Sequence, residues 1–365
     1  MNIVCSKQEL SEAANHISRV VSSKSPLPAL TGLLIVAKDN RLKITGYDLE
    51  MGMITEIPAT VSDSGKIVLD ARLFCDIVRR LPEDVVNMSV DERNVCKISC
   101  GKALFSLVGI NADEYPEMPT VDNAQSVTLP SEMLQSMVRQ TIFSVADVNG
   151  PKPILSGIHY EIGNGRIRLV ACDGYRISIR TETINTDCEM NFTVPSKAMS
   201  EVIKLISDGN DIVISASNRH IIFNVDGYEV ISRLLDGEFF DYKRAIPADF
   251  TSSITGTTAD MTEMIERISQ VIVERLKTPI ICSFENSIFH ASCLTELGNA
   301  QDEMDVDMTG ENVKIGFNSK YLSEALRASE TDKVKINIGS PLSPISITPI
   351  DGDSFLFIIM PVKIR

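Results

Sequence analysis

The residues that could carry chemistry are few in this chain, and most of them stand apart. Cys96 and Cys100 in CKISC have the spacing of a metal-binding pair, but on a strand they are simply two positions on one face. A structural zinc site normally needs four ligands, and the sequence offers neither a second cysteine pair nor a histidine cluster. We therefore interpret the eight cysteines as reduced structural thiols and expect no metal, as is typical of a cytoplasmic protein.

A catalytic site has one candidate, the segment ACDGYRIS, which holds Cys, Asp, Tyr and Arg together and would use Cys172 and Asp173. This leaves a small-molecule hydrolase open as an alternative. However, the common nucleotide-binding, zinc-protease and serine-hydrolase motifs are absent, and no histidine has a Ser, Cys or Asp at a recognisable spacing. Asp173 also recurs as Asp48, 125 residues earlier, which favours a structural role in capping a turn through its own backbone. We expect no catalytic residue and no cofactor.

The elements that must position these residues repeat along the chain. In six places an apolar residue in a strand-like run is followed, seven positions later, by an apolar residue that opens a helical run. The pairs recur every 60 to 65 residues: Ile3/Leu10, Ile67/Phe74, Val127/Leu134, Phe192/Met199, Ile254/Met261 and Ile315/Leu322. Taken two at a time they give a period of about 125 residues, which predicts three similar domains. We expect their boundaries at residues 1–121, 127–246 and 250–365.

The periodicity of each element predicts the fold class. One apolar stripe per helix, as at Leu10, Ala14 and Ile17, is typical of a helix that packs on a sheet. The strands alternate apolar and polar residues and are joined by short connections, which favours antiparallel sheets with one face covered. We therefore expect an α+β protein in which each domain has two α-helices packed on antiparallel sheets. No apolar run approaches the roughly 20 residues of a membrane helix, so we expect no membrane contact.

The distribution of charge points in two directions. The net charge is −14, which by itself argues against nucleic acid as a partner. Yet each of the six predicted helices carries Lys or Arg away from its apolar stripe. If six like units curve round, their polar faces form one lining that could hold a polyanion through its phosphates, without sequence preference. The alternative is that these are ordinary solvated helix faces.

Several segments, in order along the whole chain, resemble the bacterial DNA polymerase III β subunits, the sliding clamps. The resemblance implies the DNA clamp fold: three similar domains per protomer and a head-to-tail dimeric ring with helices lining the central hole. It also implies a non-catalytic processivity factor that encircles duplex DNA. The segments that carry the resemblance are LTGLLIVA, ITGYDLEMGM, LDARLFCDIVRRLP, FSLVGINADEYPEM, ACDGYRIS, LLDGEFFDYKRAIP, IGFNSKYLSEAL and FIIMPVKIR.

The resemblance also implies a set of partners. They are double-stranded DNA, a second copy of the chain, the DNA polymerase III α subunit, an ATP-driven clamp loader, repair polymerases and mismatch-repair proteins. The proteins of this set dock through short hydrophobic peptides with a characteristic Gln and Leu. Such a protein is expected in the cytoplasm, at the nucleoid.

A peptide-binding groove is implied at fourteen positions. Three depart from the family pattern, since Cys172 and Tyr175 stand where Thr and His are usual, and Phe240 replaces a common Pro. These departures leave open a specialised clamp paralogue, for example one resistant to an antibiotic that blocks the groove. The groove positions are Leu155, Cys172, Gly174, Tyr175, Arg176, Ile177, Phe240, Arg244, Ala245, Pro344, Ile358, Met360, Pro361 and Val362.

Two further sets of residues follow from the same resemblance. The positions expected to contact DNA are Lys24, Arg72, Lys152, Arg176 and Lys197. The positions expected at the dimer interface are Lys102, Phe105 and Leu107 at one end of the chain, and Val271, Ile272, Val273, Glu296, Asp302 and Glu303 at the other. Lys102 is nearly the only cation at its edge, so we expect a ring of lower stability than in relatives.

Overall fold

The chain packs into two compact units. The computed structural model describes residues 1–364 except for 83–84, 122–123 and 273–277. The first unit contains Met1–Leu134 and Lys197–Leu234, and the second contains Gln135–Ser196 and Leu235–Arg365. Both units consist of α-helices and antiparallel sheets, as the apolar periodicity predicts.

The six predicted strand–helix repeats are all present. Each helix begins directly after its strand or one residue later. Both apolar residues of each predicted pair, such as Ile3 and Leu10, are buried, except for the half-buried Phe192. The strands are β1 (Asn2–Ser6), β5 (Gly65–Asp70), β9 (Gln125–Pro130), β13 (Met190–Pro195), β17 (Ser252–Thr257) and β22 (Val313–Phe317). The helices that follow them are α1 (Lys7–Ser18), α2 (Ala71–Arg80), α3 (Ser131–Ile142), α4 (Ser196–Val202), α5 (Thr258–Ser269) and α6 (Ser319–Ala328).

Short polar residues at the strand–helix junctions start several of these helices. The Ser6 hydroxyl accepts a hydrogen bond from the Glu9 amide at 3.5 Å, and the Asp70 carboxylate accepts one from the Leu73 amide at 2.8 Å. The Asn318 side chain does the same for α6. Each satisfies a backbone N–H at the helix end that has no partner within the helix, and Ser6 and Asp70 are also the last residues of their strands.

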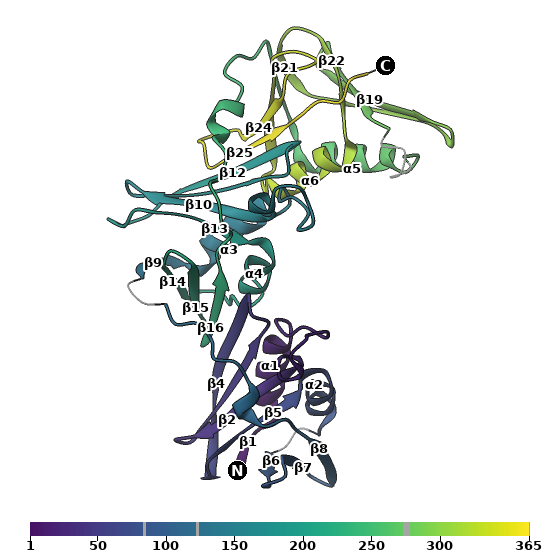
Figure 1. The fold of residues 1–365 in the computed structure, drawn as a ribbon. Helices are drawn as coiled ribbons and strands as arrows, with labels where there is room; N and C mark the ends of the chain where they lie inside the picture. Colours follow the sequence, from purple (N-terminus) through teal and green to yellow (C-terminus); the bar gives the residue numbers. More distant parts are fainter. Residues whose placement is uncertain (83–84, 122–123, 273–277, 365) are drawn as a thin grey trace. The chain divides into compact units, whose positions relative to one another are not determined.

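The first unit is built on one antiparallel sheet of twelve strands. Its main path runs β8-β7-β6-β1-β4-β16-β15-β14-β9, with β2, β3 and β5 joined beside β4. Helices α1 and α2 lie side by side against this sheet (Figure 1). The remaining strands are β2 (Gly32–Lys38), β3 (Arg41–Tyr47), β4 (Met51–Asp63), β6 (Val85–Val90), β7 (Val95–Cys100), β8 (Ala103–Val108), β14 (Asp211–Ala216), β15 (His220–Val225) and β16 (Tyr228–Arg233).

The second unit contains a nine-stranded and a four-stranded antiparallel sheet. Their orders are β13-β10-β11-β12-β25-β24-β23-β17-β21 and β20-β19-β18-β22. Helices α5 and α6 pack together, and the large core between them and the sheets includes Phe284, Phe289 and Phe317. The remaining strands are β10 (Gly157–Gly163), β11 (Arg166–Cys172), β12 (Arg176–Thr183), β18 (Ile280–Glu285), β19 (Ile288–Thr295), β20 (Gly298–Asp305), β21 (Asp307–Gly310), β23 (Lys333–Ile338), β24 (Ile345–Pro349) and β25 (Phe355–Ile359).

The sheets are not confined to single sequence repeats. In the first unit β4 pairs with β16, so Thr55 lies opposite Tyr228 although they are far apart in the sequence. In the second unit β12 pairs with β25 through the register Ile177–Ile358. Backbone hydrogen bonds of a continuous sheet therefore join one repeat to the next. The packing units accordingly divide the middle repeat, and the sequence-based domain boundaries stay a prediction.

Candidate functional site

The candidate catalytic segment forms a tight turn between β11 and β12. One Asp173 carboxylate oxygen accepts hydrogen bonds from the amides of Tyr175 at 2.9 Å and Arg176 at 3.0 Å. Gly174 has φ +92°, a conformation that glycine adopts without strain. The same turn occurs at Asp48, whose carboxylate accepts hydrogen bonds from the amides of Glu50 at 3.0 Å and Met51 at 2.7 Å. The structure thus confirms that Asp173 caps a turn through its own backbone.

Cys172 lacks the properties of a nucleophile. Its side chain is buried, and burial raises the pKa of the thiol to about 11, so that the thiolate is rare at neutral pH. The sulfur accepts a hydrogen bond from the Gly174 amide at 3.2 Å and is thereby engaged in the same turn. These contacts argue against the hydrolase alternative.

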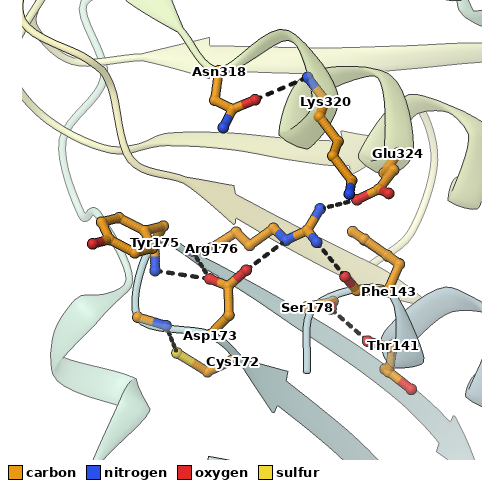
Figure 2. Close-up of polar contacts among 11 residues, drawn as sticks. Thr141, Phe143, Cys172, Asp173, Tyr175, Arg176, Ser178, Asn318, Lys320 and Glu324 are labelled. Atoms are coloured by element: carbon orange, nitrogen blue, oxygen red, sulfur yellow. Dashed lines mark hydrogen bonds and ion pairs between the residues drawn. The ribbon is translucent and has the colours of Figure 1, made fainter. Parts of the chain in front are cut away.

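Arg176 is buried at the centre of a charged network (Figure 2). Its Nε donates to the second Asp173 oxygen at 2.9 Å, and its two terminal nitrogens donate to Glu324 and to the carbonyl of Phe143. The guanidinium also lies 4.4 Å from the centre of the Tyr321 ring. Each of the three guanidinium nitrogens has a partner, and Arg176 is only 7% exposed, which argues against a contact between this side chain and a DNA phosphate.

Four of the predicted groove residues come together in one apolar cluster. Leu155, Cys172, Ile177 and Ile358 belong to one buried cluster, and the pairing of β12 with β25 sets Ile177 opposite Ile358. We call this set the junction cluster; its buried members are Leu155, Val170, Cys172, Ile177, Ile179, Tyr242 and Ile358. Val170, Ile179 and Tyr242 belong to the cluster but were not predicted from the sequence. Val170 and Ile179 could have been found from strand alternation. Val170 shares a face of β11 with Cys172, and Ile179 shares a face of β12 with Ile177.

A loop segment covers one side of the junction cluster. Phe239 stacks on His159 of β10 with ring centres 4.4 Å apart, and the short 3₁₀ helix Tyr242–Ala245 (η4) inserts Tyr242 into the cluster. Three predicted groove residues remain exposed at its margin: Tyr175 at 62%, Met360 at 43% and Phe240 at 37%. The Met360 amide donates to the Tyr175 carbonyl at 2.9 Å, which fixes two of these margin residues beside each other.

The other predicted groove residues differ in exposure. Arg244 is exposed and pairs with Asp241 at 2.9 Å, and Ala245 is exposed next to it on η4. Pro344, Pro361 and Val362 are half-buried, and Gly174 is exposed at its turn.

The equivalent region of the first unit is filled by the chain's own side chains. Its cluster contains Leu30, Tyr47 and Tyr115, with Met118 packed against it. Leu30 and Tyr47 precede Leu155 and Cys172 by 125 residues, so Tyr47 stands where the junction cluster has the smaller Cys172. The Met118 side chain reaches the backbone of Gly52 so closely that a Cβ there would lie 2.3 Å from its terminal methyl. The two repeats therefore form apolar clusters at equivalent positions, and the first has the larger Tyr47 where the second has Cys172.

The predicted DNA-contacting cations other than Arg176 are exposed. Lys24, Arg72 and Lys197 belong to the first unit, and Lys152 belongs to the second. Lys197 pairs with Asp48 at 2.6 Å, whereas Arg72 lies in the first turn of α2.

The two predicted dimer surfaces lie at sheet edges. Strand β8 is the last strand of the twelve-stranded sheet, and its Phe105 is exposed. Leu107, however, is turned into its own unit, and the outward positions are Leu104 and Val108, which are 69% and 83% exposed. A sheet edge that carries exposed apolar residues is a template for pairing with another chain. Lys102, just before the strand, is exposed.

Strand β20 ends the four-stranded sheet of the second unit. Its Glu303 is exposed, as is Glu296 in the preceding turn. Asp302 is instead held by Arg267 of α5 at 2.7 Å, so its charge already has a partner within the protomer. Val271 and Ile272 are half-buried against the core, and Val273 lies outside the described residues.

Neither a metal site nor a membrane span is found in the described part of the chain. No group of three or more His, Cys, Asp or Glu side chains there is placed to hold an ion. Likewise, none of the helices among the described residues is long and apolar enough to cross a membrane.

Comparison with known proteins gives consistent matches over the whole chain. Family models for the N-terminal, central and C-terminal domains of the DNA polymerase III beta subunit match residues 1–119, 128–241 and 243–363. The beta sliding clamp of Staphylococcus epidermidis is 31% identical over 361 residues, covering 96% of each chain.

Two crystal structures have the same fold across their full length. A putative DNA polymerase III beta subunit from Eubacterium rectale is 32% identical with a TM-score of 0.95, and each chain covers 100% of the other. The DNA polymerase sliding clamp of Bacillus subtilis is 27% identical with a TM-score of 0.96 and the same coverage. The chain therefore belongs to the family of DNA polymerase III β subunits, the bacterial sliding clamps.

Proposed function

We propose that this chain acts as a sliding clamp: two copies close into a ring around duplex DNA and hold DNA-processing proteins on it. The single observation that carries this is family membership along the entire chain, through all three domains in order. The activity is not catalytic. A closed ring keeps the polymerase on its template because the ring cannot leave DNA sideways, and this is what confers processivity.

The electrostatics of the chain fit such a topological mechanism. Strong contacts to DNA would hinder sliding, and the net charge of −14 disfavours binding to DNA from outside. The four exposed cations Lys24, Arg72, Lys152 and Lys197 are proposed to face the DNA and to interact with its phosphates without sequence preference. We place the protein at the nucleoid in the cytoplasm, with domains at 1–121, 127–246 and 250–365.

Ring closure is proposed to join the β8 edge of one protomer to the β20 edge of its partner. Two such head-to-tail contacts form a closed dimer. On β8 we propose Leu104, Phe105 and Val108 as the apolar contacts, and on the other edge Ile272, with Glu296 and Glu303 facing Lys102. The contact adds a strand to a sheet, and backbone hydrogen bonds then supply an attraction that side-chain charge alone would not.

Partner proteins are proposed to dock on the junction cluster through short apolar peptides. Its buried floor ends in an exposed margin of Tyr175, Phe240 and Met360, and Met side chains adapt readily to different partners. The proposed partners are the DNA polymerase III α subunit, the clamp loader, repair polymerases and mismatch-repair proteins. No observation in this chain favours the specialised paralogue.

Calorimetric titration with a polymerase-type Gln- and Leu-containing peptide tests the docking surface. Met360→Asp places a charge at the exposed margin, and we expect it to abolish binding without unfolding the protein. Ile350→Asp is the matched control, since Ile350 is a similarly exposed apolar residue of the same unit, in the turn after β24. Equal binding by the wild-type protein and the Met360→Asp variant would contradict the proposed surface.

A further inference from the structure

A polar cleft lies on the same sheet face as the junction cluster. Its volume is about 540 Å³, and it is lined by residues of β10, β11 and β13 together with Lys243 of η4. Arg166 and Arg168 of β11 line this cleft and share a strand face with Val170 and Cys172 of the cluster. Glu161 of β10 is paired with Arg168, so it points to the same side. The cleft therefore continues the surface on which the peptide is proposed to dock.

The floor of the cleft is a fixed, electrically neutral network. Arg168 donates to Glu161 at 3.4 Å, to the Thr181 hydroxyl at 3.2 Å and to the Tyr242 hydroxyl at 3.3 Å. The Tyr242 hydroxyl donates to Glu161 at 2.9 Å, and because burial raises the pKa of Tyr242 to about 12, it keeps the proton for this bond. The Tyr242 ring belongs to the junction cluster, so one side chain joins the cluster to the cleft.

The rim of the cleft has two exposed cations, Arg166 and Lys243, and the Lys243 ammonium lies 5.8 Å from the centre of the Tyr242 ring. Neither cation forms an ion pair with any residue in the described part of the chain. Glu189 contributes one opposing charge at the rim. Since the charges of Arg168 and Glu161 cancel on the floor, the cleft has a local excess of positive charge on a protein whose net charge is −14. Such a site favours carboxylates, which bind Arg and Lys through charge-assisted hydrogen bonds.

The dimensions of the cleft fit a short stretch of peptide. Its volume lies within the range of about 300 to 1,000 Å³ that is common for ligand sites. Arg168 and Arg166 stand four and six residues from Cys172 along β11, which corresponds to roughly 13 and 20 Å at about 3.3 Å per residue. An extended peptide anchored in the cluster covers the same distance in about four to six residues.

We infer that the cleft binds acidic side chains in the sequence that flanks the docking peptide, four to six residues from its apolar anchor. This inference rests on the proposed docking function of the junction cluster. It assigns Arg166 and Lys243 as specificity determinants: they discriminate among partners by the charge of the flank, whereas the cluster recognises the apolar motif that the partners share.

Calorimetric titration with a set of matched peptides tests this inference. All share one apolar docking motif, and the residues four to six positions away, on either side, are neutral, acidic or basic. With the wild-type protein, one of the two acidic-flank peptides should bind roughly 3- to 10-fold tighter than the neutral peptide, the size expected of two exposed ion pairs. The advantage should disappear at high salt, while the affinity of the neutral peptide stays unchanged.

A charge-reversal variant identifies the residues responsible. R166E/K243E should lose the preference for the acidic flank, bind the neutral peptide normally and gain affinity for a basic flank. K314E/K333E is the control, because it makes the same charge change at two exposed positions on other strands of the same unit. An acidic-flank advantage that survives in R166E/K243E overturns the inference, as does equal binding of the neutral, acidic-flank and basic-flank peptides by the wild-type protein. If no peptide binds the wild-type protein at all, the docking function itself fails.

Discussion

Replacement of Arg176 by Met should strongly destabilise the second unit. The substitution keeps much of the side-chain volume and removes only the charge and its hydrogen bonds. It leaves Asp173, Glu324 and the Phe143 carbonyl without their shared partner. Breaking a buried ion pair by removal of one member costs about 3 to 5 kcal/mol. Glu324 remains 30% exposed and can be partly hydrated, so we expect a loss near the lower end, about 3 kcal/mol.

The chain contains a matched control for this substitution. Arg244 pairs with Asp241 through the same atom, at the same 2.9 Å and the same three-residue spacing as Arg176 with Asp173. The difference is exposure: the Arg side chains are 7% and 88% exposed. Because exposed pairs contribute about 1 kcal/mol or less, Arg244→Met should change stability little. Burial, and not the geometry of the ion pair, then accounts for the difference in stability loss between the two variants.

Scanning calorimetry, with hydrogen exchange to assign the transition, measures both variants. For a unit of this size, a loss of about 3 kcal/mol lowers the transition temperature by roughly 6 to 12 °C. Protection should fall in β12 and α6, which the network connects. Adding Glu324→Gln to Arg176→Met should restore roughly 1 kcal/mol, because it removes an unpaired charge. A decrease for Arg176→Met no larger than for Arg244→Met would refute this reasoning.

Three further predictions follow from the proposed surfaces. Leu104→Asp and Ile272→Asp should each convert the dimer to folded monomers, measured by sedimentation; a persisting dimer would argue against these edges. Cys172 should be alkylated more slowly at pH 7 than the half-buried Cys188, and its rate should rise as the pH approaches about 11; mass spectrometry that finds Cys172 the faster would contradict its burial. Neutralising the proposed DNA-contacting cations should lower the salt dependence of binding to linear duplex DNA by about 0.9 for each phosphate that is no longer neutralised, and an unchanged slope would remove them from the DNA surface. These cations are Lys24, Arg72, Lys152 and Lys197.

The repeat could be predicted from the sequence because it is written in local patterns. A strand shows alternating apolar and polar residues, and a helix shows apolar residues three or four positions apart. A pair such as Ile3 and Leu10 therefore indicates a strand and the helix that follows it within a few residues. The ends of the elements were less predictable. Helix α1 ends at Ser18, although the apolar residues Val20 and Val21 follow, because the Arg19, Val20 and Val21 amides donate to carbonyls only three residues back.

Contacts between distant segments could not be predicted in this way. Nothing local to Arg176 indicates that Glu324, 148 residues away, will neutralise it. Alternation along β8 shows that its side chains divide between two faces, but the choice of the outward face depends on the sheet around it. Phe105 and Leu107 share one face of β8 yet differ in exposure, at 37% and 9%, a difference that alternation alone does not predict. For the groove, family resemblance supplied the positions, and the β12–β25 pairing explains why Ile177 and Ile358 meet.

Retention on circular and linear DNA tests the central claim most directly. The protein would be loaded onto a nicked circular plasmid by its clamp loader and then washed at about 1 M salt, where contacts to phosphates are strongly weakened. A closed ring predicts retention on the circle and rapid loss once a restriction enzyme linearises the plasmid. Loss from circle and linear DNA at the same rate and with the same salt dependence would mean that the protein binds DNA by surface contacts and does not encircle it.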